Sequence, residues 1–292
     1  MRSLLEIIKE AEGKKVAIGH FNFSDLAGLR AIFEAAKEVG VPVIVGVSEG
    51  EREFVGVRQA AALVKSLREE YDHPIFLNAD HTHSLEKVRE VAEAGFDEIL
   101  FDGSKLPLEE NIKQTKEAVQ LVRSINKRIL VEGEIGYIGG SSEVLKERPE
   151  GIELTTPEEA ARFVKETKVD VLAPAVGNMH GLLARTDADG TRTYAEKRLD
   201  TDRIRLIKEA VKVPLTLHGG SGTADEDFVA AIKAGINIIH INTEIRLAWR
   251  RGVEEGLAKN PDEIAPYKIL PPAVLAIKEI VKKRLSLFNF LN

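Results

Sequence analysis

The chain has 292 residues, 43% of them hydrophobic and 30% charged, which is enough to bury a large core in one barrel-sized domain or in two smaller ones. Its formal net charge of -6 argues against nucleic acid as a main partner, because binding to phosphate backbones requires a basic surface. The absence of cysteine excludes disulfides and thiolate ligands, so any metal site must use nitrogen and oxygen atoms.

Segment 1–15 has the pattern of an amphipathic helix with interleaved charges, and it lacks the apolar core of a signal peptide. No later run approaches the roughly 18 consecutive apolar residues of a membrane span. We therefore expect a cytoplasmic protein that has neither membrane nor nucleic acid as a partner.

Short, β-branched apolar runs recur along the rest of the chain. They lie at residues 16–22, 42–48, 75–81, 98–103, 129–136, 169–177, 214–221 and 236–244. Nearly continuous apolar runs are typical of parallel strands that are buried on both faces. Helical patterns lie between them, such as 85–94 and 225–234, and several end at a glycine. A further amphipathic helix starts at Pro271 and could cover the barrel or a neighbouring subunit.

Eight strand–helix units predict an α/β protein with a (β/α)₈ TIM barrel, an N-terminal helix and a C-terminal helical extension. We expect one domain over residues 1–292, because no low-complexity linker divides the chain. An open, doubly wound sheet is the alternative, but the glycines of HGGSG (218–222) lack the spacing of a dinucleotide fingerprint. Segment 137–156 is the longest stretch without periodicity and is predicted to be a mobile loop above the fifth strand.

Three of the seven histidines follow predicted strands: His81, His180 and His218. Strand ends of a barrel meet on one face, so these imidazoles could bind one metal ion there and leave a position open for substrate. A hydrogen-bonded structural role is the ordinary alternative for any single histidine. His20, His73 and His83 lack such placement, and we expect His83 to be a loop residue or a supporting residue.

The glycines beside these histidines predict an anion site. Gly181 follows His180, and Gly219, Gly220 and Ser221 follow His218. Glycine allows backbone N–H groups to approach an anion, and the serine hydroxyl adds a donor. Asn242 and Thr243 end the eighth strand, and loops after strands seven and eight commonly bind phosphate in this barrel class. A plain tight turn is the alternative for the glycine run alone.

Several motifs together resemble the class II, metal-dependent ketose-bisphosphate aldolases, the family of the fructose- and tagatose-bisphosphate enzymes. They cover nearly the whole chain in order: FN (21–22), ADH (79–81), FDGSKLPLEENI (101–112), EGEIGYIGG (132–140), GNMHG (177–181), LHGGSG (217–222) and INTE (241–244). The resemblance implies a barrel with a divalent metal, usually zinc, that reversibly cleaves a phosphorylated ketose. It also allows for a second or a monovalent cation, and we expect a homodimer or homotetramer.

The resemblance also suggests roles for further residues. Asp80 matches the family's catalytic aspartate, and general acid/base transfer at the C4 hydroxyl suits a carboxylate at this place; orienting a metal-binding histidine is the alternative. Asp102 and Glu134 match positions of an alternative or second metal site, although they could equally give electrostatic support. Glu132 needs a buried partner if it faces inward with Glu134. Asn22 and Ser48 match positions near the substrate.

Three positions depart from the family pattern. His240 stands where strand eight commonly has an asparagine beside the reactive carbon. Alternation with Ile239 and Ile241 predicts that its ring points into the barrel. After the glycine pair 139–140, serines replace the usual acidic pair, so either Glu143 is the loop acid or the loop acid is absent. No lysine follows His180-Gly181 closely, and the nearest cation is Arg185.

These features predict an aldolase that cleaves a phosphorylated ketose, most simply fructose 1,6-bisphosphate, into dihydroxyacetone phosphate and an aldehyde such as glyceraldehyde 3-phosphate. Tagatose bisphosphate or another ketose phosphate is the alternative substrate. A metal-dependent sugar-phosphate isomerase or epimerase would need a second base opposite Asp80, for which His240 is the candidate. A degenerate scaffold that only binds sugar phosphates is the non-enzymatic alternative, against which the retained Asp80 and histidines argue.

Overall fold

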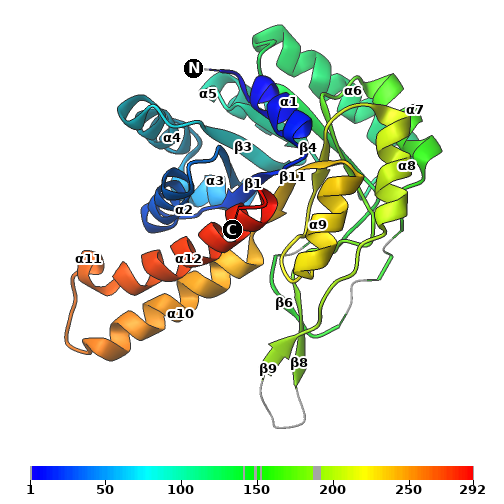
Figure 1. Cartoon of the computed structure of the whole chain (residues 1–292). Coiled ribbons are helices and arrows are strands. Elements are labelled where there is room, and N and C mark those ends of the chain that lie inside the picture. Colours follow the sequence, from blue (N-terminus) through cyan, green and yellow to red (C-terminus); the bar gives the residue numbers. More distant parts are fainter. Residues whose placement is uncertain (1, 141, 148–149, 152, 187–191, 292) are drawn as a thin grey trace.

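The computed structural model describes residues 2–140, 142–147, 150–151, 153–186 and 192–291. Its centre is a closed barrel of parallel strands surrounded by helices (Figure 1). The strands are β1 (Ile18–Asn22), β2 (Val43–Val47), β3 (Ile75–Thr82), β4 (Glu98–Phe101), β5 (Leu130–Ile135), β7 (Val171–Pro174), β10 (Leu215–Leu217) and β11 (Ile236–Ile241). The predicted TIM barrel is therefore confirmed, and the open-sheet alternative is wrong because β1 pairs with both β2 and β11.

Seven of the eight strands lie within their predicted apolar runs, whereas β3 continues one residue beyond its run, to Thr82. Several strands end earlier than predicted. β7 ends at Pro174, and β10 ends at Leu217, directly before His218. The polar and glycine-rich residues that follow belong to loops, which is why they are available for a site.

Eleven helices follow α1 in the described part of the chain, most of them directly after a strand. They are α2 (Leu26–Val39), α3 (Glu49–Val55), α4 (Val57–Tyr71), α5 (Leu85–Ala94), α6 (Leu108–Ile125), α7 (Pro157–Thr167), α8 (Thr201–Val211), α9 (Asp225–Ala234), α10 (Thr243–Lys259), α11 (Pro266–Ile269) and α12 (Pro271–Phe288). The predicted glycine cap is confirmed at Gly95, whose φ of 85° lies in the left-handed region that ends α5.

The N-terminal helix α1 (Leu4–Lys14) closes the end of the barrel at which the strands begin. Its buried residues Leu4, Ile7 and Ile8 form a cluster with side chains from the starts of the strands, including Phe76 and Ile238. Ser3 caps the helix through a reciprocal pair of hydrogen bonds with Glu6. Since this end is filled by apolar side chains, the opposite end is left for a polar site.

The C-terminal helix α12 covers the barrel rather than extending freely from it. It packs against α2, α10 and β1, and it buries Ile277, Val281, Leu285 and Phe288. Figure 1 shows α10, α11 and α12 side by side as an arm at one side of the barrel. The prediction that this helix covers the barrel is thus confirmed.

A second, small sheet was not predicted. It consists of β6 (Val144–Leu145), β8 (Leu182–Thr186) and β9 (Arg192–Tyr194). Segment 137–156 therefore contains a strand, because Val144 and Leu145 pair in parallel with Leu182 and Leu183. β8 and β9 form a hairpin that projects from the barrel in Figure 1.

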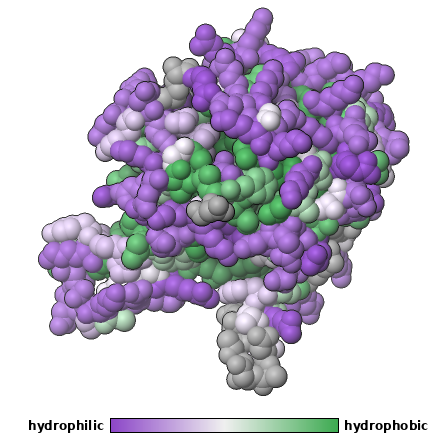
Figure 2. All heavy atoms as spheres, viewed as in Figure 1, coloured by the Kyte–Doolittle hydropathy of each residue, from purple (hydrophilic) through white to green (hydrophobic). Residues whose placement is uncertain are grey.

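The surface in Figure 2 is mostly hydrophilic, with hydrophobic residues gathered toward the middle of this face. Within the described residues, no helix is both long enough and apolar enough to cross a membrane.

Candidate metal and sugar-phosphate site

A cavity of about 330 Å³ opens at the C-terminal ends of the barrel strands. Catalytic sites of this fold lie at this end, where loops from several strands meet. The cavity brings together many of the residues predicted from sequence, namely Ser48, Asp80, His81, Asp102, Glu143, His180 and Asn242. A smaller adjoining pocket adds Asn22, Gly181, His218, Gly219, Ser221, His240 and Thr243.

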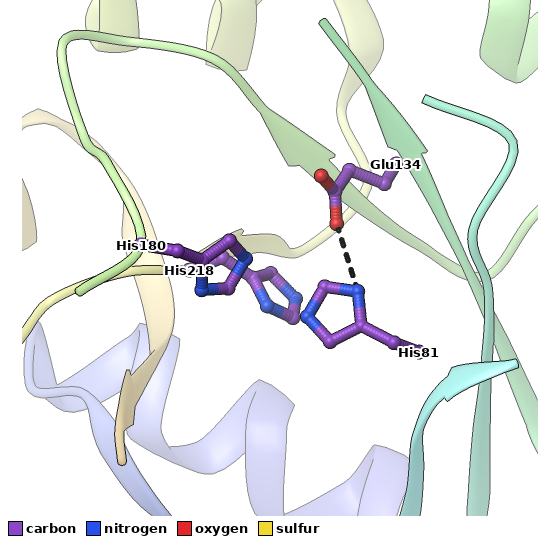
Figure 3. Close-up of side chains that lie close together, drawn as sticks. All are labelled: His81, Glu134, His180 and His218. Atoms are coloured by element: carbon purple, nitrogen blue, oxygen red, sulfur yellow. Dashed lines mark ion pairs between the residues drawn. The ribbon is translucent and has the colours of Figure 1, made fainter. Parts of the chain in front are cut away.

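The three predicted metal-binding histidines face one another although they are far apart in sequence. The ring centroid of His81 lies 4.9 Å from that of His180 and 5.1 Å from that of His218. Figure 3 shows the rings gathered with the carboxylate of Glu134 above His81. One ligand atom from each of the four side chains lies within 4.8 Å of those of the others.

The donor set of this cluster fits a divalent metal such as zinc. Imidazole nitrogens and a carboxylate oxygen are suitable zinc ligands. His180 Nε2, His218 Nδ1 and Glu134 Oε2 are buried and have no hydrogen-bond partner among the described residues, so a cation would satisfy them. Burial lowers the pKa of His218 to about 3 and that of His180 well below its usual value, which keeps both rings neutral with lone pairs available.

Two carboxylates orient the histidines from outside the cluster. Asp102 Oδ2 lies 2.8 Å from His81 Nδ1, while its Oδ1 accepts hydrogen bonds from the backbone and hydroxyl of Ser104. Glu132 Oε1 lies 3.0 Å from His218 Nε2, which supplies the buried partner that Glu132 requires. Such carboxylate–histidine contacts fix the ring orientation and tautomer of metal-binding histidines. Asp102 therefore has the geometry of a supporting group, whereas Glu134 belongs to the four-residue cluster.

The backbone around Asp80 and His81 is unusual. His81 has a φ of 41°, and the pairing register of β3 with β4 shifts between Ala79 and Thr82. This irregularity lets the neighbouring side chains of Asp80 and His81 both line the cavity. The buried guanidinium of Arg52, which sequence reasoning missed, donates to the Asp80 carbonyl at 3.0 Å and to Thr82 Oγ1 at 3.1 Å.

Asp80 is held as a carboxylate beside the histidine cluster. Burial opposes its charge, but the positive field of His81 and contact with His240 outweigh burial and keep the pKa of Asp80 well below its usual value. Asn22 Nδ2 donates to Asp80 Oδ2 at 2.8 Å. Asp80 Oδ1 lies 3.6 Å from both His81 Nε2 and His240 Nδ1, which is beyond normal hydrogen-bond length. One carboxylate oxygen is therefore fixed and the other faces the histidines.

Glu51 connects the walls of the cavity and was not predicted. Its Oε2 accepts hydrogen bonds from Asn22 Nδ2 at 2.9 Å and from the Ser48 backbone at 2.7 Å, while its Oε1 lies 2.8 Å from Arg246 Nη2. Ser48 and Glu51 form the capping box of α3. The Ser-x-x-Glu spacing could have located this helix start, but it carries no sign of the contact with Asn22.

The ring of His240 points into the barrel as predicted. Ile239 and Ile241 lie in the outer apolar core, whereas His240 stacks on His20 with ring centroids 3.4 Å apart and planes at 1°. His20 lies within β1 rather than past the end of a strand, and it pairs in register with His240 on the neighbouring strand β11. Burial lowers the pKa of His240 well below its usual value and that of His20 to about 4, so both rings are neutral.

The alternation that places His240 ends at residue 243, where α10 begins. Asn242 and Thr243 consequently both line the smaller pocket. Glu244, in the first turn of α10, accepts hydrogen bonds from Arg284 and from the Gly222 backbone. Asn242 Oδ1 is buried and has no hydrogen-bond partner among the described residues.

Most of the residues predicted for the anion site line one pocket, with one exception. Gly181 and Gly219 have positive φ angles of 80° and 61° and line the smaller pocket with Ser221 and Thr243. Gly220 was also predicted as a backbone donor, but its N–H donates to the His240 carbonyl at 3.1 Å. Its amide is therefore committed to β11 and cannot also donate to an anion in this arrangement.

The comparisons with known proteins agree with this geometry. The family described as Fructose-bisphosphate aldolase class-II matches residues 2–292. The fructose-bisphosphate aldolase of Geobacillus stearothermophilus is 35% identical over 98% of this chain and 96% of its own length. The 6-phospho-5-dehydro-2-deoxy-D-gluconate aldolase of Bacillus licheniformis is 34% identical over 98% of this chain and 94% of its own length. The crystal structure of the YdjI aldolase from Escherichia coli K12 superimposes with a TM-score of 0.80 at 28% identity, covering 99% of this chain and 97% of that one.

Proposed function

Because the chain belongs to the class-II fructose-bisphosphate aldolase family, we propose that it is a metal-dependent aldolase acting on fructose 1,6-bisphosphate. The products are dihydroxyacetone phosphate and glyceraldehyde 3-phosphate, and the reaction is reversible. The observation that carries this proposal is the position of the Asp80 carboxylate, 3.6 Å from His81 in a cluster of three histidines and Glu134. Such a site combines a carboxylate for proton transfer with ligands for a Lewis acid.

The protein groups have separate tasks in the proposed reaction. Asp80 takes the proton of the C4 hydroxyl as the C3–C4 bond breaks, and it returns that proton to the aldehyde oxygen during condensation. Asn22 fixes Asp80 Oδ2 and thereby directs Oδ1 toward the substrate. Glu143, exposed at the rim of the cavity, protonates C3 of the departing fragment so that dihydroxyacetone phosphate is released.

The metal and anion sites complete the proposed arrangement. We propose zinc at His81, His180 and His218, with Glu134 as a further or alternative ligand; when bound, it stabilises negative charge on the ketose oxygens. Asp102 and Glu132 hold the histidine rings in place. Gly181, Gly219, Ser221 and Thr243 bind the phosphate next to the dihydroxyacetone carbons, and Ser48 lies at the aldehyde side. We further propose that residues 1–292 form one catalytic domain, working as a homodimer or homotetramer in the cytoplasm.

The geometry gives less support to the isomerase or epimerase alternative. That chemistry needs two bases on opposite faces of the substrate, and His240 was the candidate for the second. His240 Nδ1 lies only 3.6 Å from Asp80 Oδ1, so the two groups approach the substrate from the same side.

A coupled assay for dihydroxyacetone phosphate release tests the proposed function. The zinc-loaded protein should cleave fructose 1,6-bisphosphate faster than tagatose 1,6-bisphosphate and 6-phospho-5-dehydro-2-deoxygluconate. Faster cleavage of one of the latter two substrates would support an aldolase activity but contradict fructose 1,6-bisphosphate as its substrate. No release from any of them by folded, metal-loaded protein would contradict the proposal.

A further inference from the structure

Lys197 is a buried lysine beside the loops that carry two of the candidate metal ligands. It follows β9 in the sequence and is only 7% exposed. Its Nζ donates to the Met179 carbonyl at 2.5 Å and to the Gly219 carbonyl at 2.9 Å. Met179 directly precedes His180 and Gly219 directly follows His218, so one ammonium group joins the two loops.

The backbone fixes this lysine in place. Lys197 N donates to the Gly222 carbonyl at 3.0 Å, and Lys197 forms an isolated parallel bridge with Thr223. The β8–β9 hairpin leaves the barrel after Gly181 and returns the chain to the glycine loop at this point. The hairpin therefore explains how a lysine distant from His180 in sequence reaches the loops that carry His180 and His218.

The electrostatic setting of Lys197 calls for an anion. Burial lowers its pKa to about 7, and the field of Glu244 only partly opposes this. No carboxylate lies within salt-bridge distance of its Nζ among the described residues. A buried cation that is compensated only by neutral carbonyls is costly, and an ammonium has three N–H donors, of which the carbonyls use two. Gly219, whose carbonyl accepts one of these hydrogen bonds, also lines the pocket of Gly181 and Ser221 at which the anion site was predicted.

We propose that Lys197 is a built-in cation of the substrate-phosphate site. Its ammonium balances the phosphate charge and holds the loops after β7 and β10 together. Converging carbonyl oxygens are typical ligands of monovalent cations, so Lys197 occupies the place that a free cation would otherwise take. This inference rests on the proposed function, because it assumes a phosphorylated substrate.

Phosphate binding by the zinc-loaded full chain tests this assignment. Isothermal titration calorimetry in choline chloride at fixed ionic strength gives the Kd of inorganic phosphate. Steady-state kinetics in the same buffer give KM for fructose 1,6-bisphosphate. Lys197→Ala should weaken phosphate binding and raise KM by roughly 10–100-fold, with a smaller change in kcat. Methylammonium or K⁺ should recover much of the loss in Lys197→Ala, and neither ion should affect the unaltered protein.

Two further variants make the test specific. Lys197→Met keeps most of the aliphatic stem and should show the same loss of phosphate affinity. Arg198→Met removes the neighbouring charge, which is 68% exposed and paired with Asp227, and should bind phosphate like the unaltered protein. Folding of each variant is checked by circular dichroism and by zinc content.

Several results would overturn the assignment. One is wild-type phosphate affinity in a folded Lys197→Ala or Lys197→Met protein, and another is a loss that neither cation restores. If neither variant folds, phosphate binding by the unaltered protein is measured with K⁺ in place of choline. A tenfold gain in affinity would show that a free cation, rather than Lys197, serves the site. Phosphate binding without cleavage of any ketose would count against the proposed aldolase activity and not against Lys197.

Discussion

His240 is the inward-facing residue at which this chain departs most clearly from the family pattern. Its ring stacks on His20 and its Nδ1 lies 3.6 Å from Asp80 Oδ1, so it borders the carboxylate proposed to transfer the proton. His240→Asn restores the family residue. We expect it to change kcat or the preference among ketose phosphates, while the free energy of unfolding changes by no more than about 1–2 kcal/mol.

Kinetics with the substrate panel and urea unfolding check this expectation together. His73→Asn is a suitable control, because His73 is also partly buried but packs against Phe33, outside the cavity. Unchanged kinetics on every substrate, combined with a large loss of stability, would assign His240 a packing role only.

Asp80 carries the second prediction about a single side chain. Asp80→Ala should lower kcat by roughly 10²–10⁴-fold, because general acid/base transfer contributes about that much. The variant should still bind stoichiometric zinc and inorganic phosphate, since neither site uses this carboxylate as a proposed ligand. Steady-state kinetics and metal analysis measure the two effects. If Asp80→Ala instead loses zinc and excess metal restores turnover, Asp80 orients a metal-binding histidine and does not transfer the proton.

Strands β4 and β5 place the carboxyl groups of Glu98 and Glu132 inside the barrel. Burial, followed by the charge of Glu132, raises the pKa of Glu98 well above its usual value. A group whose pKa is raised in the folded state contributes stability that is fully present below its unfolded-state pKa. That contribution is lost as the pH rises through the folded-state pKa. The contribution of Glu98 to the free energy of unfolding should therefore fall as the pH rises above about 5.

Glu98→Gln removes one of these carboxyl groups while keeping an amide that can bond Asn78. We expect the loss of stability with rising pH to be smaller in this variant, as measured by urea unfolding at several pH values. Glu117→Gln, on the exposed face of α6, should leave the pH profile as it is in the unaltered protein. Identical profiles for Glu98→Gln and the unaltered protein would show that Glu98 is not responsible for the pH dependence.

The elements that could be predicted are those with a long, regular pattern. The barrel strands were found because each is an apolar run, and the direction of His240 followed from its alternation with Ile239 and Ile241. The β8–β9 hairpin was missed because its short strands pair at only three positions and mix apolar with polar residues. No apolar period marks it in the sequence.

The candidate site was predictable where motifs stand at strand ends, as for Asp80 and His218. It was not predictable where a contact depends on how separate loops meet. Lys197 reaches Met179 and Gly219 only because the hairpin returns beside the glycine loop. The backbone N–H of Gly220 looked available in the sequence, and only the path of β11 shows that it is used.

Metal binding acts on the molecule as a whole, because the four candidate ligands join four separate strand–loop units of the barrel. His81, Glu134, His180 and His218 follow or belong to β3, β5, β7 and β10, so the cluster is complete only when the barrel is closed. A metal that binds the folded chain and not the unfolded one stabilises it by mass action, by about 2.7 kcal/mol at a free concentration 100 times Kd.

Removing the metal should therefore lower both stability and activity. We expect chelator treatment to abolish turnover and to lower Tm by several degrees, and Zn²⁺ or Co²⁺ to restore both, as measured by the coupled assay and by thermal melting. His218→Ala should lose stoichiometric metal and show no rise in Tm when Zn²⁺ is added. Asp80→Ala is the matched control, since it should keep the metal-dependent rise in Tm while remaining nearly inactive. A chelated, metal-free protein with full activity would contradict the proposed mechanism, and a metal-dependent Tm in His218→Ala would place the ion elsewhere in the molecule.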